Sequence, residues 1–141
     1  MFKYAKNISM PDGYTEDRQE LWRLFVKECP FPNIAPASVW FEMAVGNADR
    51  VRICRKFFDE RVKEFEAASP GDGALAYLNS KGVAGEGKLH PLLNLWVDSE
   101  KLLLSQMEDM GMKEDAQARV IKVVGSSKEA VKLAEQLNQS T

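Results

Sequence analysis

The stretch that decides the fold is residues 36–67, "PASVWFEMAVGNADRVRICRKFFDERVKEFEA", in which no further proline follows the first residue. A proline is tolerated in the first turn of a helix, so Pro36 can open one. Apolar side chains then recur at steps of three and four residues, the spacing of an amphipathic helix. They are Trp40, Met43, Ala44, Val51, Cys54, Phe58, Val62 and Phe65. The spacing predicts one long helix, and Gly46 is its weak point, at about 1 kcal/mol relative to alanine.

The length of this helix bears on assembly. Roughly 32 residues at 1.5 Å each would span about 48 Å. A compact globule formed by a chain of 141 residues has a diameter of only about 37 Å. We therefore expect the helix either to kink near Gly46 or to protrude and pack on another subunit.

Two further helices are expected on either side of the long one. Thr15 is suited to cap a helix that must end by Cys29, because prolines follow. Pro91 can start another helix, which runs to about Met110 and ends at Gly111, a residue suited to a left-handed C-cap. The apolar stripe of this second helix consists of Leu92, Leu95, Trp96, Leu102, Leu103, Met107 and Met110.

The C-terminal part reads as two short helices. One spans roughly 113–124 and is broken by Gly125, and the last begins with a capping box of Ser126 and Glu129. Residues 74–89 suggest a short extended piece or a small hairpin instead. The fold class is all-α: a long helix plus shorter helices, with a protruding helical hairpin, assembling into a ring-like oligomer. The expected organisation is a flexible N-terminal arm at 1–14, a single helical domain at 15–137 with a glycine-rich loop at 69–89, and a frayed C-terminus at 138–141.

Composition and charge exclude some classes of protein. The net charge is −2, which excludes a generally basic nucleic-acid coat but leaves room for a local basic patch. Cys29 and Cys54 lack metal-ligand spacing and read as reduced, partly buried thiols. No secretory signal is visible, and no apolar stretch approaches the roughly 20 residues that span a bilayer. We therefore expect a cytoplasmic protein.

One motif suggests phosphate binding, and we discount it. Gly82–Lys88 matches the G-x-x-x-x-G-K pattern, but Leu89 stands where a phosphate loop needs the hydroxyl that binds Mg²⁺. His90 is the only histidine, which excludes a histidine-based metal cluster. Four carboxylates could bind a cation but lack a recognised loop spacing, so a solvated acidic surface is expected. They are Glu108, Asp109, Glu114 and Asp115. We expect no catalytic residue, no metal site and no cofactor.

Basic residues gather in the second half of the long helix. Residues 50–63 hold six basic and two acidic groups, a local charge of +4. On a helix, Arg52, Lys56 and Lys63 share one face, with Arg55 at its edge. Phosphate binding and simple solubility use the same residue types, so the alternative is a solvated face. We predict that these four residues bind DNA.

A second set of residues on this helix is assigned to oligomerisation. Arg50 and Arg61 fall beside the apolar face, where intersubunit ion pairs would form. Residues 98–115 have the opposite sign, with six acids against two lysines, so head-to-tail contacts between subunits are conceivable. The predicted oligomerisation residues are Trp40, Arg50, Phe58, Arg61 and Phe65.

Residues 89–120 carry a resemblance to a known family. A glycine-rich loop leads into His90-Pro91, an apolar helix, Met110-Gly111-Met112 and finally Arg119. This order is similar to the C-terminal signature of the P27-like family of phage terminase small subunits. That signature has an Asn-Pro or similar pair, a helix, and a Leu-Gly-Leu-x-Pro-x-x-Arg-like ending.

The resemblance implies a non-enzymatic DNA-packaging factor in the cytoplasm of a host cell. Such proteins assemble as rings, recognise double-stranded viral DNA, and act with a large subunit that has the ATPase and nuclease. The signature transfers no catalytic role. Pro91 and Gly111 would start and stop a helix, and Arg119 could pair with Glu114 or Asp115 or reach a neighbouring subunit.

Two other classes of function remain as alternatives. In the first, the helices at 113–124 and 127–138 form a helix-turn-helix of a DNA-binding transcriptional regulator, with Lys128 and Lys132 facing DNA. In the second, the 82–88 loop belongs to an ATP-binding enzyme. A dimer would favour the regulator, whereas a ring of many copies would favour the terminase small subunit. Nucleotide binding would favour the enzyme.

Overall fold

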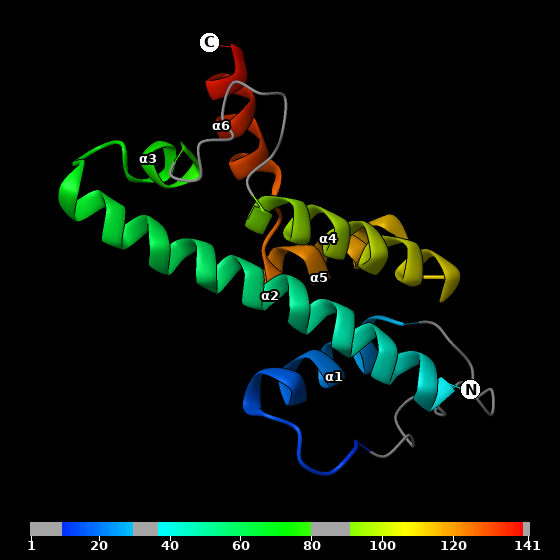
Figure 1. Cartoon of the computed structure of the whole chain (residues 1–141). Helices are drawn as coiled ribbons and strands as arrows, with labels where there is room; N and C mark the ends of the chain where they lie inside the picture. Colours follow the sequence, from blue (N-terminus) through cyan, green and yellow to red (C-terminus); the bar gives the residue numbers. More distant parts are fainter. Residues whose placement is uncertain (1–9, 30–36, 80–90, 140–141) are drawn as a thin grey trace. The chain divides into compact units, whose positions relative to one another are not determined.

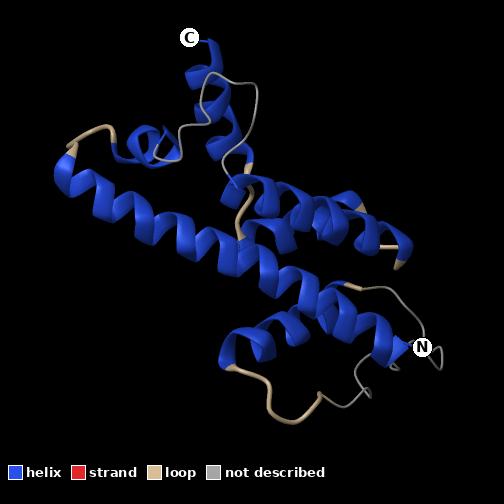
Figure 2. Ribbon diagram, viewed as in Figure 1, coloured by secondary structure: helices blue, strands red, loops and turns tan. Residues whose placement is uncertain are grey.

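The chain is helical throughout the parts that its structure describes. The computed structural model describes residues 10–29, 37–79 and 91–139. Within these ranges, helices are joined only by turns and loops, and no strand occurs (Figure 2). The helices are labelled in chain order in Figure 1: α1 (Glu16–Glu28), α2 (Ala37–Ala68), α3 (Gly73–Asn79), α4 (Pro91–Asp109), α5 (Glu114–Val124) and α6 (Lys128–Gln139). The prediction of an all-α fold is confirmed.

The helices divide into two compact units, each built from two separate segments of chain. Unit 1 comprises Met1–Arg52 and Ser99–Gly125, and unit 2 comprises Ile53–Asp98 and Ser126–Thr141. Helices α2 and α4 each contribute one part to either unit. The organisation expected from the sequence, with a single domain over 15–137, stays a prediction, and so does the assembly into a ring.

Helix α2 is the predicted long helix, and it continues through Gly46 without interruption. Helix α1 also begins and ends as predicted: the Thr15 side chain accepts a hydrogen bond from the backbone of Arg18, and Cys29 is the C-cap. The sequence-based spacing of prolines and capping residues was therefore sufficient to place both helices.

The core of unit 1 is formed by the inward faces of α1, α2, α4 and α5. Its fully buried large side chains include Leu21, Phe25, Phe41, Val45, Val51, Leu103, Met107 and Val120. Trp22 of α1 packs edge-on against Phe41 of α2, with 5.7 Å between ring centroids. Apolar burial of this kind is the dominant favourable term in folding.

A glycine turn connects α4 to α5. Gly111 has a φ of +76°, a left-handed conformation that costs little only for glycine. The amide of Gly111 donates to the carbonyl of Glu108, and the amide of Met112 donates to that of Met107. These two bonds make a Schellman motif, which satisfies carbonyls left open at the end of α4. The predicted C-cap is confirmed.

Arg119 then joins α5 to α1. Its Nε lies 2.5 Å from Oε2 of Glu28, whose side chain is nearly buried, and its Nη1 lies 3.5 Å from Asp115. The hydrogen bond that Arg119 donates to Glu28 raises the pKa of Arg119. Pairing with Asp115 was one of the partners expected from the sequence, whereas Glu28, 91 positions away, was not foreseen.

Unit 2 has an aromatic core. Phe58 of α2 packs against Tyr77 of α3 and Trp96 of α4, with centroids 5.9 and 5.4 Å apart. Phe65, two turns further along α2, packs on the same Tyr77 at 5.5 Å. Burial raises the pKa of Tyr77, and the charge of Arg61 acts in the opposite direction. These rings hold α2, α3 and α4 of this unit together.

Helix α3 corrects one prediction. Residues 74–89 were expected to be extended, but Gly73–Asn79 forms a helix, and the remainder lies outside the described residues. Glu66 of α2 accepts hydrogen bonds from the backbone amides of Gly71 and Gly73. Asp72 holds the N-cap position, where its carbonyl accepts from the amide of Ala76, and Glu66 adds bonds to amides that the start of a helix leaves open.

Two of the predicted apolar stripes also need correction. Met43 of α2 was expected to face the core but is 56% exposed, and Leu102 of α4 is 50% exposed. Leu95 is exposed as well. The core positions are taken by neighbours one or two residues away, such as Phe41 and Leu103. Both helices thus leave an apolar face open.

None of the helices in the described ranges combines the length and the low polarity that crossing a bilayer requires.

Candidate functional site

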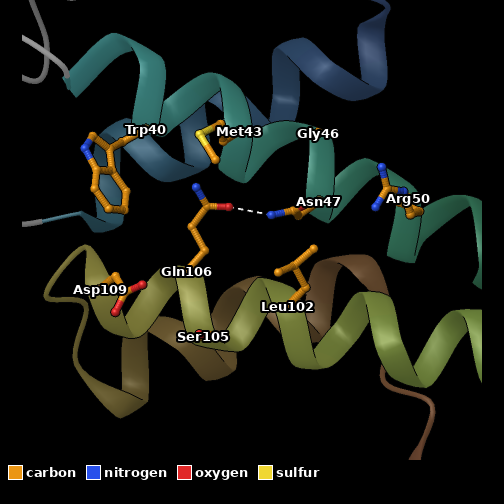
Figure 3. A pocket seen from close by; sticks show the side chains of 9 residues that line it. All are labelled: Trp40, Met43, Gly46, Asn47, Arg50, Leu102, Ser105, Gln106 and Asp109. Carbon is orange, nitrogen blue, oxygen red and sulfur yellow. Dashed lines mark hydrogen bonds between the residues drawn. The ribbon is translucent and has the colours of Figure 1, made fainter.

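A groove in unit 1 lies between α2 and α4 and has a volume of about 480 Å³. Its walls are shown in Figure 3. Helix α2 contributes Trp40, Met43, Gly46, Asn47 and Arg50, and α4 contributes Leu102, Ser105, Gln106 and Asp109. A mostly apolar groove with a few polar groups is the usual form of a binding site for a small ligand.

The register of the two helices is fixed by an amide pair on the floor of the groove. The side-chain amide of Asn47 donates to the side-chain oxygen of Gln106. The two helices run in opposite directions here (Figure 3). One end of the groove therefore carries Met43 and Asp109, and the other carries Arg50 and Leu102.

The floor of the groove combines a buried polar group with open space. Gln106 is only 6% exposed, and its amide nitrogen points towards the side of Trp40 and Met43 (Figure 3). A Cβ added to Gly46 would meet no atom within 4 Å. The groove is therefore open at its centre and has a hydrogen-bonding group at its base.

The walls are apolar and accessible. Met43 and Leu102 are both at least half exposed, and Val39 lies one turn before Met43 and is exposed as well. Large apolar side chains are usually exposed singly, and their grouping around a groove marks a surface for interaction. Sequence reasoning assigned Trp40 and Arg50 to such a surface and missed the other residues of the groove.

The predicted DNA-binding residues have different surroundings. Arg52 is in unit 1, where its guanidinium lies 3.3 Å from Glu20 and 3.8 Å from Asp17, and its side chain is only 17% exposed. Arg55, Lys56 and Lys63 are in unit 2 and are exposed. Arg55 pairs with Asp59 at 3.0 Å, one turn along the same helix. The four residues thus do not form one equally accessible set, and their binding to DNA stays a prediction.

The predicted oligomerisation residues also separate. Trp40 and Arg50 line the groove of unit 1. Phe58 and Phe65 are half-buried within the aromatic core of unit 2. Arg61 lies over the ring of Phe57, 4.8 Å from its centroid, and 2.9 Å from Glu64. Trp40 and Arg50 are therefore the members of this set that line an open groove.

The remaining sequence candidates concern phosphate and metal chemistry. Gly82–Lys88, Leu89 and His90 lie outside the described residues. Among the residues that are described, no three histidine, cysteine, aspartate or glutamate side chains are grouped as a metal site requires. Both cysteines are buried and neither forms a disulfide, and the Sγ of Cys29 lies 3.8 Å from the carbonyl of Met110.

Comparison with known proteins adds no relative. No family model matches the chain, and no match is found among curated proteins or solved structures. The case for a function therefore rests on the residues of this chain.

Proposed function

We propose that this protein is a terminase small subunit: a non-catalytic factor that recognises double-stranded viral DNA and starts genome packaging with an ATPase and nuclease large subunit. In this proposal several copies form a ring, and each copy supplies a few phosphate contacts. Contacts that are weak singly gain strength in a ring through effective concentration.

The observation that carries the proposal is the exposed surface of α2. Four large apolar side chains of this helix are exposed, together with three basic side chains of the part that belongs to unit 2. The apolar residues are Val39, Met43, Ile53 and Phe57, and the basic residues are Arg55, Lys56 and Lys63. A helix that exposes both kinds of residue is suited to contact other molecules, with apolar groups for protein and cations for phosphate.

The signature residues support the proposal in a second way. Pro91 is the first residue of α4, Gly111 ends it in a left-handed conformation, and Arg119 ties α5 to α1. Each therefore has a structural role, which agrees with a signature that transfers no catalytic function. The resemblance itself remains the reason for naming DNA packaging.

The ion pairs on α2 refine which residues would contact DNA. Arg52 is held by two carboxylates of α1, so we assign it to the fold. Lys56 and Lys63 are the leading candidates, with Arg55 able to exchange Asp59 for phosphate. An exposed pair of that kind contributes only about 0–1 kcal/mol, so its exchange costs little.

DNA binding is tested with the double variant Lys56→Glu and Lys63→Glu. Each phosphate contact contributes about −0.9 to the slope of log K against log salt, so the double variant should flatten the slope by about 2 for each subunit that contacts DNA. Fluorescence anisotropy with a labelled duplex at several salt concentrations measures this. Affinity should fall alike for all sequences.

The matched control is Lys27→Glu with Lys113→Glu, which changes the net charge equally at two exposed positions of unit 1. This control should keep the wild-type slope. Equal loss in both double variants would show that only net charge matters, and no loss in either would remove this face of α2 from DNA binding.

Assembly is tested separately by light scattering coupled to gel filtration. The proposal expects a closed oligomer of more than about four copies, because rings arise from head-to-tail contacts that close. A concentration-independent monomer would overturn both the ring and the terminase assignment.

The runner-up is a helix-turn-helix regulator. Its two helices are α5, which contacts α1 within unit 1, and α6, which contacts α3 within unit 2. Loss of DNA binding on changing Lys128 and Lys132, with no loss on changing Lys56 and Lys63, would favour this function.

A further inference from the structure

The groove of unit 1 has a small residue at the centre of each wall. Gly46 lies near the midpoint between Met43 and Arg50, and Ser105 lies near the midpoint between Leu102 and Asp109. Glycine inside a helix costs about 1 kcal/mol relative to alanine. Since a Cβ at Gly46 would meet nothing, the fold of this chain does not require glycine there. The missing side chain instead leaves room for something that enters the groove.

The two ends of the groove are complementary to each other. One end offers Met43 with the negative charge of Asp109, and the other offers Leu102 with the positive charge of Arg50. Each end therefore combines one apolar and one charged side chain, and the charges are opposite. A surface whose two ends complement one another can pair with a copy of itself.

Only one orientation of two copies uses this complementarity. A two-fold axis that crosses α2 at Gly46 and α4 at Ser105 reverses both helices. The end with Arg50 and Leu102 in one copy then meets the end with Met43 and Asp109 in the other. The parallel orientation would bring two copies of Arg50 to the same end, which like-charge repulsion disfavours.

We propose that this groove is the docking site for a second copy of the chain, related by that two-fold axis. Pairing covers Met43 and Leu102 and brings Arg50 of each copy to Asp109 of the other. The small residues Gly46 and Ser105 allow the helices to approach closely on the axis. The interface is isologous, whereas a ring requires a further head-to-tail surface. It does not depend on DNA packaging and would join copies of this chain in pairs with or without DNA.

Cross-linking tests the symmetry of the contact directly. A residue on a two-fold axis faces its own counterpart, so Ser105→Cys should form a disulfide-linked dimer under mild oxidation. Gly46→Cys should do the same from the other helix. Non-reducing electrophoresis measures the linked fraction. The native Cys29 and Cys54 are buried, so we expect little cross-linking of the wild-type protein. The linked fraction of the wild type therefore serves as the background for the variants.

The control for cross-linking is Ala118→Cys, an exposed small residue on α5 outside the groove. It should stay near the wild-type background. If neither Ser105→Cys nor Gly46→Cys links more than Ala118→Cys does, the two-fold contact is wrong, whatever the size of the native particle.

A charge exchange tests the pairing of the ends. Arg50→Glu should raise the dimer dissociation constant by about tenfold or more, because two like charges then meet at each end. Adding Asp109→Arg to that variant should restore association, and sedimentation equilibrium measures both. Arg23→Glu on the exposed side of α1 provides the matched charge change and should leave the dissociation constant as in the wild type.

Failure of this charge exchange to recover association would overturn the pairing of Arg50 with Asp109. All of these measurements are made without DNA. Absence of the two-fold dimer from the wild-type protein, with salt-dependent DNA binding intact, would therefore reject the docking site and leave the proposed function standing. A two-fold dimer without salt-dependent DNA binding would reject the proposed function and leave the docking site standing.

Discussion

Helix α2 is held differently in the two units. In unit 1 its charged residues pair with another helix: Asp49 lies 2.8 Å from Arg18 of α1, and Arg52 lies 3.3 Å from Glu20. In unit 2 the pairs of Arg55 with Asp59 and of Arg61 with Glu64 lie within α2, and aromatic rings join it to other helices. One continuous helix thus uses its charges for tertiary structure in one half and leaves them on the surface in the other.

The difference shows what a charge count along a sequence can and cannot mean. In the sequence, the local charge of +4 over residues 50–63 suggests one basic surface. In the fold, however, acidic side chains neutralise its basic residues to different extents. Arg52, in a partly buried pair, has a role in stability, whereas Lys63 is exposed on the surface of the helix. Substitutions in the two halves should therefore have distinct effects.

The largest effect is expected in the aromatic core of unit 2. Phe58→Ala should lower the free energy of unfolding by about 3 kcal/mol, because its ring contacts both Tyr77 and Trp96 and a cavity would remain. The neighbouring Phe57 is 44% exposed, and Phe57→Ala should cost about 1 kcal/mol or less, mainly through the lost contact with Arg61. Urea unfolding followed by circular dichroism compares the two, and equal losses would contradict an aromatic core in this unit.

A smaller effect is expected from the ion pairs. Asp49→Ala should cost about 2 kcal/mol, since Asp49 is buried and a hydrogen bond to a charged group is lost. Asp59→Ala should cost about 0.5 kcal/mol or less, because its pair with Arg55 is exposed. The same unfolding measurement at low and high salt separates the two. If the two substitutions lowered the free energy of unfolding equally at high salt, the proposed contrast between the halves of α2 would be wrong.

The smallest effects come from two glycines with opposite expected signs. Gly46→Ala should raise stability by about 1 kcal/mol, because alanine favours helix and the added Cβ meets nothing. Gly111→Ala should lower stability by about 1 kcal/mol, since its left-handed φ strains any other residue. Thermal unfolding of both variants tests this, and a destabilised Gly46→Ala protein would show that the groove is narrower than described.

Local signals made much of the fold predictable. Prolines and capping residues placed the ends of α1, α2 and α4, because these signals act within a few residues along the chain. The left-handed turn at Gly111 was predicted for the same reason. Pairing of Arg119 with Asp115 is also local, at a spacing of four residues.

Contacts between distant segments were not predictable in the same way. Helix α3 begins where Glu66, a residue of the preceding helix, accepts from the amides of Gly71 and Gly73, and the residues beside the start of α3 do not reveal this contact. The groove was missed because Leu102, Leu103 and Leu104 are consecutive and a helix cannot bury all three on one side. That run of leucines was the available sign that one of them faces outward.

Gly73 has a consequence for recognising relatives of this chain. A Cβ at this position would lie 2.8 Å from the carbonyl oxygen of Val62 and 2.9 Å from the Cα of Glu66, closer than backbone atoms of a neighbouring helix can tolerate. Natural selection should therefore retain glycine there in any homologue that keeps α3 against α2, together with an acidic or amide side chain at position 66. An acid or amide followed seven positions later by an obligatory glycine is a fingerprint that could identify diverged members of the lineage.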